Sequence, residues 1–208
     1  HSHGHDHGAA AAASPAYRRI LWVALVVNLA MFVVEIGAGV AAQSASLLAD
    51  SLDFLGDAAN YGISLFVLGM ALHLRARASL VKAASMALFG LWVAYTTINH
   101  ALAGTVPAAP IMGAVGALAF AANLGVAFLL YRWREGDSNM RSVWLCTRND
   151  AIGNLAVLVA AAGVFGSGTG WPDYIVAAIM SGLALTSAVQ VARHAVVELR
   201  APQAVGNL

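Results

Sequence analysis

The sequence predicts an all-α, polytopic membrane protein with six transmembrane helices and both termini in the cytoplasm. Of its 208 residues, 60% are hydrophobic and only 10% are charged, whereas about 25% of the residues of a soluble protein are charged. The mean hydropathy is +0.75. Apolar runs of about 20 residues, long enough to cross a hydrocarbon core of about 30 Å, recur along the chain. The uneven distribution of basic residues then orients these runs.

The length of each apolar run predicts a helix, and the Gly, Pro and Ser residues between the runs predict the loops that separate these helices. The predicted helices cover residues 19–42, 47–72, 79–103, 108–132, 140–164 and 172–198. The turn between the second and third helices is expected at residues 75–79. Around this transmembrane domain of residues 17–200 we expect a flexible tail over residues 1–16 and a short tail over residues 201–208.

Basic residues gather around the loops of one side and are missing from the other three loops. That side holds Arg18, Arg19, Arg75, Arg77, Lys82, Arg132, Arg134, Arg141, Arg193 and Arg200. Because Lys and Arg are retained on the cytoplasmic side, this pattern places both termini there, with an even number of spans. The exception is Arg148, which lies within the fifth predicted span.

The second predicted span contains three acids, Asp50, Asp53 and Asp57, at positions i, i+3 and i+7 of one helix face. An ionisable side chain at membrane depth costs at least about 2.5–3.5 kcal/mol on insertion scales, so it indicates a functional site. Acids in this position indicate a chain that handles a cation.

The fifth predicted span carries Cys146, Asp150 and Asn154 at i, i+4 and i+8. With a rise of about 1.5 Å per residue, Asp57 and Asp150 each lie roughly 15 Å inside their spans, near the midplane. The two helices run in opposite directions, so Asp53 can lie level with Asp150, and Asp57 with Cys146. Three carboxylates and a thiolate can surround a divalent ion tetrahedrally. Because ligands must be deprotonated to bind, metal and protons compete for such a site.

Four further polar residues are accessory candidates beside this site: Asp50, Asn28, Asn149 and Asn154. The alternative for Asp50 is a capping or helix-bonding role near the outer surface. The asparagines are equally understood as hydrogen-bonding contacts between helices. Cys146 is either a ligand or a small buried apolar residue; as the single cysteine it excludes an internal disulfide.

The chain begins with alternating histidines, His1, His3, His5 and His7. Such a low-complexity tract is typical of flexible metal binding, and we expect it to collect ions on the cytoplasmic side. The alternative is an expression tag, although tags usually have contiguous histidines.

Two segments carry a family resemblance. Residues 46–57, with their Ala-Asp-Ser-Leu-Asp-Phe-Leu-Gly-Asp run, resemble the second-helix signature of the cation diffusion facilitators. Residues 149–154, with Cys146 four residues before Asp150, resemble the fifth-helix partner of that signature. Asn28, Phe32 and Glu35 in the first helix also fit.

The resemblance implies a multi-pass protein of the bacterial inner membrane that exchanges Zn²⁺ or related divalent ions for protons by alternating access. It places the transported metal on Asp53, Asp57 and Asp150, with Cys146 at the usual histidine position. That departure leaves the choice among Zn²⁺, Cd²⁺, Co²⁺ and Fe²⁺ open. We expect these ions as substrates and no cofactor. We also expect no C-terminal cytoplasmic domain, so that any homodimer forms through the spans.

Two other classes of function remain as alternatives. An intramembrane aspartyl protease would use Asp57 and Asp150 as an acid/base pair, but the Gly-x-Gly-Asp motif is missing. A non-transporting metal sensor or chaperone would bind metal without flux. His-Glu-x-x-His is absent from the sequence, and we expect neither an enzyme nor a nucleic-acid-binding protein.

Overall fold

The computed structural model describes residues 15–67, 72–134 and 138–200, and within them every regular element is helical. The helices are α2 (Pro15–Ala42), α3 (Ala45–Gly62), the π-helix η1 (Ile63–Val67), α4 (Leu72–Ala103), α5 (Ala109–Tyr131), α6 (Ser138–Ser167) and α7 (Trp171–Arg200). Of the flexible tail predicted over residues 1–16, residues 15–16 belong to α2, and residues 1–14 lie outside the described residues. The predicted C-terminal tail, residues 201–208, also lies outside them.

Five segments are long and apolar enough to cross a membrane: Pro15–Ala42, His73–Ala103, Ala109–Tyr131, Trp144–Ser167 and Trp171–Arg200. Their outer faces expose large apolar side chains, such as Leu102, which is 83% exposed, and Phe128, which is 78% exposed. Helices that are apolar on their outer faces are matched to lipid rather than to water. The molecule is therefore a multi-pass membrane protein. The acid-bearing α3 is not one of these five segments.

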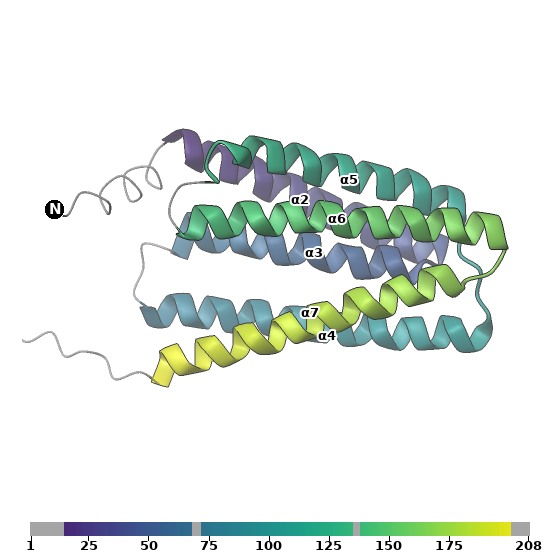
Figure 1. Ribbon diagram of the computed structural model, residues 1–208. Helices are drawn as coiled ribbons and strands as arrows, with labels where there is room; N and C mark the ends of the chain where they lie inside the picture. Colours follow the sequence, from purple (N-terminus) through teal and green to yellow (C-terminus); the bar gives the residue numbers. More distant parts are fainter. Residues whose placement is uncertain (1–14, 68–71, 135–137, 201–208) are drawn as a thin grey trace, which may run out of the picture.

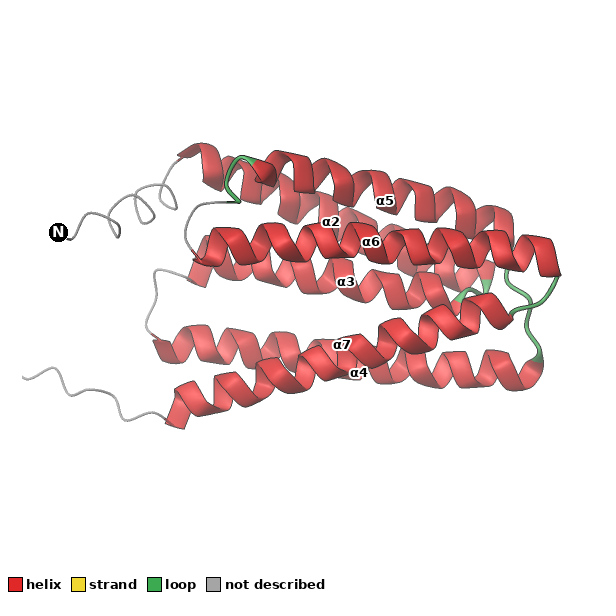
Figure 2. Ribbon diagram, in the orientation of Figure 1, coloured by secondary structure: helices red, strands yellow, loops and turns green. Residues whose placement is uncertain are grey.

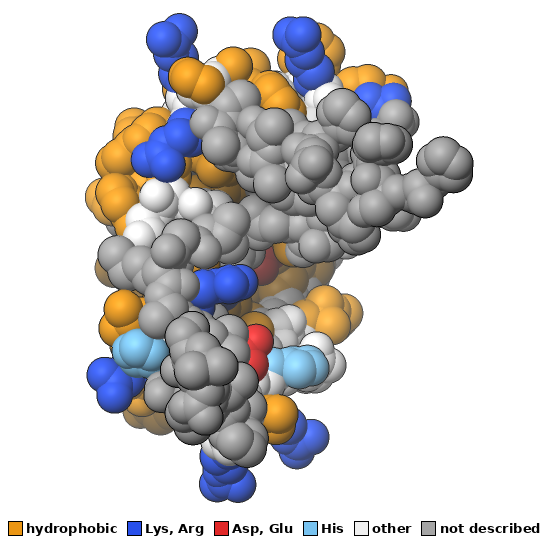
Figure 3. Space-filling model, turned by 90° about the vertical axis from the view of Figure 1, so that its left-hand side faces the viewer, with side chains coloured by type: hydrophobic (Ala, Val, Ile, Leu, Met, Phe, Trp, Pro, Cys, Tyr) orange, Lys and Arg blue, Asp and Glu red, His pale blue; other side chains and the backbone are white. Residues whose placement is uncertain are grey.

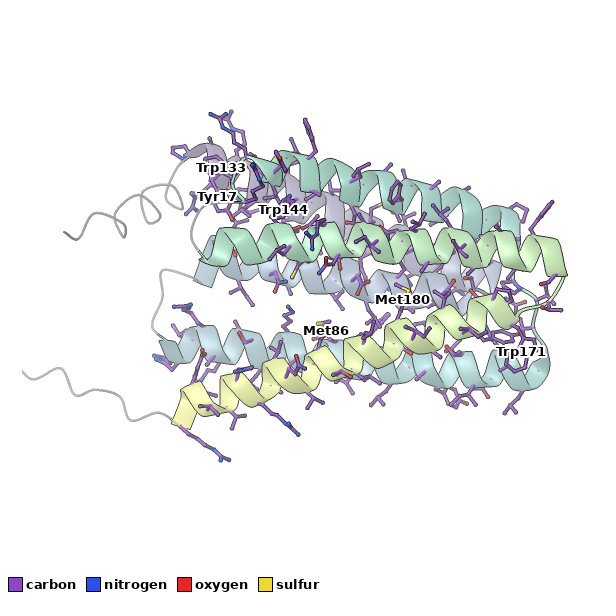
Figure 4. The ribbon with its side chains drawn as sticks, viewed as in Figure 1. Tyr17, Met86, Trp133, Trp144, Trp171 and Met180 are labelled. Atoms are coloured by element: carbon purple, nitrogen blue, oxygen red, sulfur yellow. The ribbon has the colours of Figure 1, made fainter. Side chains whose placement is uncertain are left out.

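The helices run alternately up and down in one bundle (Figure 1). Pro15 and Arg200, where the described chain begins and ends, lie at the same end, which we call the terminal end. The turns from α2 to α3, α4 to α5 and α6 to α7 lie at the opposite end, which we call the far end (Figure 2). Aromatic side chains mark both ends (Figure 4): Tyr17 and Trp133 pack at 5.2 Å between ring centroids, and Trp171 lies against Tyr174 at 5.7 Å. Such rings are typical of membrane–water boundaries.

The bundle divides into two groups of helices whose shared apolar core lies near the far end. The buried core near the far end includes Val93 of α4 and Ala177 and Ala184 of α7, together with residues of α3, α5 and α6. The buried core near the terminal end is built from residues of α2, α3, η1 and α5, including Tyr61 and Leu130. Helices α4 and α7 therefore form a pair that separates from the other helices toward the terminal end (Figure 1).

A buried carboxylate ties the far end together. Asp173, in the first turn of α7, accepts hydrogen bonds from Ser44 Oγ (2.7 Å), Ser46 Oγ (2.6 Å) and the backbone N–H groups of Ala45 (2.8 Å) and Ser46 (3.0 Å). These groups form the N-terminus of α3, where unpaired N–H groups and the helix dipole favour an anion. Asp173 thus holds the start of α7 against the start of α3.

The helix boundaries agree with most of the predicted spans, but the predicted turn at residues 75–79 is wrong. Helix α4 begins at Leu72 and runs through this segment without interruption. Ala and Arg, which alternate from Arg75 to Ala78, are among the strongest helix formers, so the segment extends the helix instead of ending it. At about 1.5 Å per residue, α4 is longer than the hydrocarbon core is thick.

Candidate metal site

A cavity of about 300 Å³ opens between α3, α4, α6 and α7, the helices that separate toward the terminal end. All four predicted ligands line it. The lining residues are Asp53, Gly56, Asp57, Asn60, Lys82, Met86, Cys146, Asp150, Ser187, Gln190 and Val191. Seen from the terminal end, the surface is notched between two lobes, with acidic and basic side chains visible in the notch (Figure 3).

Asp57 is the most enclosed of the four, with only 4% of its surface exposed. Its Oδ2 accepts hydrogen bonds from Tyr61 Oη at 3.0 Å and from Thr147 Oγ1 at 3.3 Å. The two hydroxyl oxygens are 2.6 Å apart, so either group can donate its single hydrogen atom to the other instead of to Asp57. Tyr61 is one helical turn after Asp57, and Thr147 comes from the facing helix α6. The carboxylate is therefore oriented by both helices before any ion arrives.

Asp150 approaches Asp57 from α6. Their carboxyl groups lie close enough to share a hydrogen bond when one of them is protonated. Asp53, one turn before Asp57, interacts electrostatically with both of them. A Cβ added at Gly153 would lie 3.6 Å from Asp53 Oδ2. The glycine thus lets α6 come close to this carboxylate.

The four predicted ligands share one cavity without forming a closed cage. Among the described residues, no three His, Cys, Asp or Glu side chains are grouped tightly enough to hold a metal ion. Cys146 and Asp150 are half-buried, as is Asp53. Because tetrahedral coordination requires ligand distances of about 2.0–2.3 Å, binding an ion here requires α3 and α6 to draw their acids closer together.

Lys82 is a residue of this cavity that the sequence interpretation missed. It had been counted among the basic residues of the cytoplasmic loops, but it lines the cavity from α4. Its Nζ donates to Asn60 Oδ1 at 2.5 Å, and its charge acts on Asp57, Cys146 and Asp150. The wrongly predicted turn at residues 75–79 concealed its depth: because α4 begins at Leu72, Lys82 lies roughly 15 Å along the helix and not at its end.

The accessory candidates divide into two sets. Asp50 and Asn154 are in contact, since Asn154 Nδ2 donates to Asp50 Oδ2 at 2.6 Å. Both are fully buried and do not line the cavity.

Asn28 is also buried, but it donates to the backbone carbonyl of Ala24 in its own helix at 2.8 Å. Asn149 is exposed and accepts from Arg148 at 3.1 Å. The structure therefore does not bring Asn28 and Asn149 to the cavity, and it places Arg148 outside as well.

Comparison with known proteins identifies this arrangement. The family model of the cation efflux transmembrane domain matches residues 21–200, which include every residue of the cavity. The chain belongs to this cation efflux family. The match thus covers all the described helices except the first residues of α2.

One relative of this cation efflux domain is the cadmium, cobalt and zinc/H(+)-K(+) antiporter of Bacillus subtilis (strain 168). It is 21% identical over 207 residues, which cover 93% of this chain and 65% of the relative. The chain therefore spans slightly less than two thirds of the length of that relative.

Proposed function

We propose that the protein exports divalent metal ions, with Zn²⁺ as the principal substrate, in exchange for protons. The observation that carries this proposal is the meeting of α3 and α6 acids in one cavity within a multi-pass membrane protein of the cation efflux family. The name of the Bacillus relative, which includes three divalent metals and protons, supports the same class of substrates.

In this proposal Asp53, Asp57, Cys146 and Asp150 hold the ion. Three carboxylates and a thiolate suit a borderline-soft dication, and the thiolate shifts the preference toward softer ions such as Cd²⁺. Asp57 and Asp150 already lie within hydrogen-bonding distance when one proton is present between them. A metal ion displaces that proton, because both need the same oxygen atoms.

The shape of the bundle supports alternating access. The cavity lies where the two helix groups separate, toward the terminal end, while Asp173 and a shared apolar core join them at the far end. Under the positive-inside rule the terminal end is cytoplasmic, so this conformation loads ions from the cytoplasm. Transport then requires α4 and α7 to move relative to the other four helices until the cavity faces outward.

The proposal includes α3 with η1 as a sixth span, which gives both termini a cytoplasmic location in the bacterial inner membrane. Together these helices cover residues 45–67, which is long enough to cross the hydrocarbon core. Composition alone does not identify α3 as a span, because Asp50, Asp53 and Asp57 make it too polar. Homodimers through the apolar outer faces, and ion collection by the histidine tail, also belong to the proposal.

The test is metal flux in proteoliposomes that contain a zinc-sensitive dye and carry a pH gradient. We expect uptake of Zn²⁺ with proton counterflow, and complete loss of it in Asp57→Asn and Asp150→Asn. Asn149→Ala is the matched control on α6, because this side chain lies outside the cavity. Unchanged flux in Asp150→Asn would contradict the site. Metal binding without flux in the unmodified protein would instead indicate a sensor or chaperone.

A further inference from the structure

A second pair of acids is buried away from the metal cavity. Glu35 of α2 and Asp50 of α3 are both fully inaccessible to solvent, and their carboxyl groups are close enough to share a hydrogen bond. Asn154 of α6 donates to Asp50 at 2.6 Å, and Asn123 of α5 donates to Asn154 at 2.9 Å. Four helices therefore meet at this pair.

The pair has far fewer hydrogen-bond donors than its oxygen atoms require. Both carboxyl oxygens of Glu35 and Oδ1 of Asp50 have no partner in the described part of the chain. The buried Asp173 provides the contrast, since four donors surround its carboxylate. A buried ionised carboxylate without donors or a counter-charge is costly. Some cation must therefore accompany Glu35 and Asp50.

The surrounding charged groups do not supply that cation. The groups that act on Glu35 are Asp50 and Asp53, both acidic, and the groups that bond to Asp50 are Glu35 and Asn154. The neighbouring side chains from α5 and α6, Asn123 and Asn154, are neutral. Lys82 acts on the other side of the site, on Asp57, Cys146 and Asp150.

The spacing favours a proton over a metal ion. Two carboxyl groups at hydrogen-bonding distance leave room between them for a hydrogen atom, whereas a metal ion needs oxygen atoms about 2.0–2.6 Å away on several sides. One proton would supply the missing donor to one carboxyl group and neutralise the other. The amide of Asn154 already stabilises the carboxylate that remains.

We propose that Glu35 and Asp50 form a proton site that is separate from the metal cavity and coupled to it by charge. The site lies roughly 10 Å from the far end of α2, between that end and the cavity. Asp53 of the metal cavity interacts electrostatically with both Glu35 and Asp50. A dication held at Asp53 therefore favours loss of the proton from the pair, and a proton on the pair weakens metal binding.

This inference rests on the proposed function, because it places one of the exchanged protons. The proton leaves as H⁺ from the carboxyl oxygen that carried it, and the pair then bears one more negative charge. No other bond is formed or broken at the pair. The metal site loses its own protons separately, when the ion takes their oxygen atoms.

The test counts the protons released when Zn²⁺ binds to the full chain in detergent, by titration calorimetry in two buffers of different ionisation enthalpy. We expect Glu35→Gln and, as a second variant, Asp50→Asn to release about one proton fewer than the unmodified protein, and the slope of log Kd against pH to fall by up to about one. Asp173→Asn is the matched control: a buried acid with four donors, whose loss should leave the proton count unchanged.

The outcomes separate the two proposals. If both Glu35→Gln and Asp50→Asn release as many protons as the unmodified protein, the proton site is wrong even where flux is normal. If the unmodified protein binds a second Zn²⁺ that Glu35→Gln no longer binds, the pair is a metal site instead. Failure of the proposed function would appear as absent flux in the unmodified protein, which this binding measurement does not require.

Discussion

At the scale of single residues, Lys82 places a positive charge beside the acids that are proposed to hold a dication. Its ammonium group acts on Asp57 and Asp150 while it is bonded to Asn60. A tethered cation of this kind balances the acids when the cavity is empty and opposes an incoming ion. In the proposed transport cycle we expect this charge to limit metal affinity, so that the bound ion can also leave.

We therefore predict that Lys82→Gln binds Zn²⁺ more tightly. Two unit charges about 4 Å apart interact by about 4 kcal/mol at an effective dielectric constant of about 20. Since about 1.4 kcal/mol corresponds to a tenfold change in Kd, we expect Kd to fall by at least roughly tenfold. Titration of the purified variant measures this change. Lys82→Arg keeps the charge and serves as the control. Equal affinity in Lys82→Gln and the unmodified protein would show that the lysine does not oppose the metal.

Cys146 provides a second prediction at this scale. A thiolate favours softer ions, whereas an imidazole or a hydroxyl group does not to the same degree. We expect Cys146→Ser to lower the ratio of Cd²⁺ to Zn²⁺ flux roughly tenfold, and Cys146→His to retain Zn²⁺ flux. Initial rates in dye-loaded proteoliposomes measure both. The same Cd²⁺ to Zn²⁺ ratio in all three proteins would make Cys146 an apolar lining residue.

The sequence predicted which acids line the cavity but not the positive charge beside them. Asp53, Asp57 and Asp150 stand out because acids are rare in apolar spans, and helix periodicity places them on facing surfaces. Lys82 does not stand out, because a basic residue near a helix end is typical of a membrane boundary. Its place in the cavity depends on the start of α4 at Leu72, which the sequence pattern did not predict.

At the scale of helices, the N-terminus of α3 is fixed by a residue that is 127 to 129 positions away. Ser44 caps α3 by accepting from the N–H of Leu47 at 3.2 Å, and its hydroxyl hydrogen bonds to Asp173. The backbone turns sharply here, with Gln43 at a φ of 54°. The Asp173 carboxylate thus connects the N-terminus of α3 with the N-terminus of α7.

Removal of that carboxylate should loosen the far end. We predict that Asp173→Asn, which replaces an acceptor oxygen by a donor facing N–H groups, lowers the free energy of unfolding by about 2–3 kcal/mol. Thermal unfolding in detergent, followed by tryptophan fluorescence, measures the shift. Ser167→Ala is the control, since the Ser167 hydroxyl bonds to the carbonyl of Gly163 within its own helix. An unchanged unfolding midpoint in Asp173→Asn would mean that the contact does not contribute to stability.

The sequence predicted where most helices begin and end, but it did not predict most of the contacts between helices. Apolar runs bounded by Gly104 and by Gly168, both at positive φ, end at turns in the structure. The predicted turn after the second span is wrong because Arg75 and Arg77, which are typical of a cytoplasmic loop, lie within α4. The bond from Ser46 to Asp173 joins residues far apart in the sequence. No local sequence pattern indicates this hydrogen bond.

At the scale of the whole molecule, the two helix groups provide a way for the proposed alternating access to take place. The α4–α7 pair shares a core with the other helices only near the far end. Movement of the pair as a unit would close the terminal end and open the far end. That movement would keep the contacts within each group and break contacts between the groups, such as the hydrogen bond from Lys82 to Asn60.

This movement predicts a distance change that spin labels can measure. Labels on Leu74→Cys in α4 and Tyr131→Cys in α5, both exposed near the terminal end, should move closer when a proton gradient drives the outward-facing state. A Cys146→Ser background that retains flux removes the native thiol. Labels on Leu74→Cys and Val197→Cys in α7 belong to one group, and their separation should stay constant. A constant distance in the first pair would contradict this rigid-group mechanism.

The uneven core has a consequence for the cell at rest. Exposing the far mouth means breaking four bonds to Asp173 and wetting a tightly packed apolar layer, whereas the terminal mouth is already open. Under the proposed exchange of metal for protons, we therefore expect an idle carrier to stay closed at the far end and not to leak protons across the membrane.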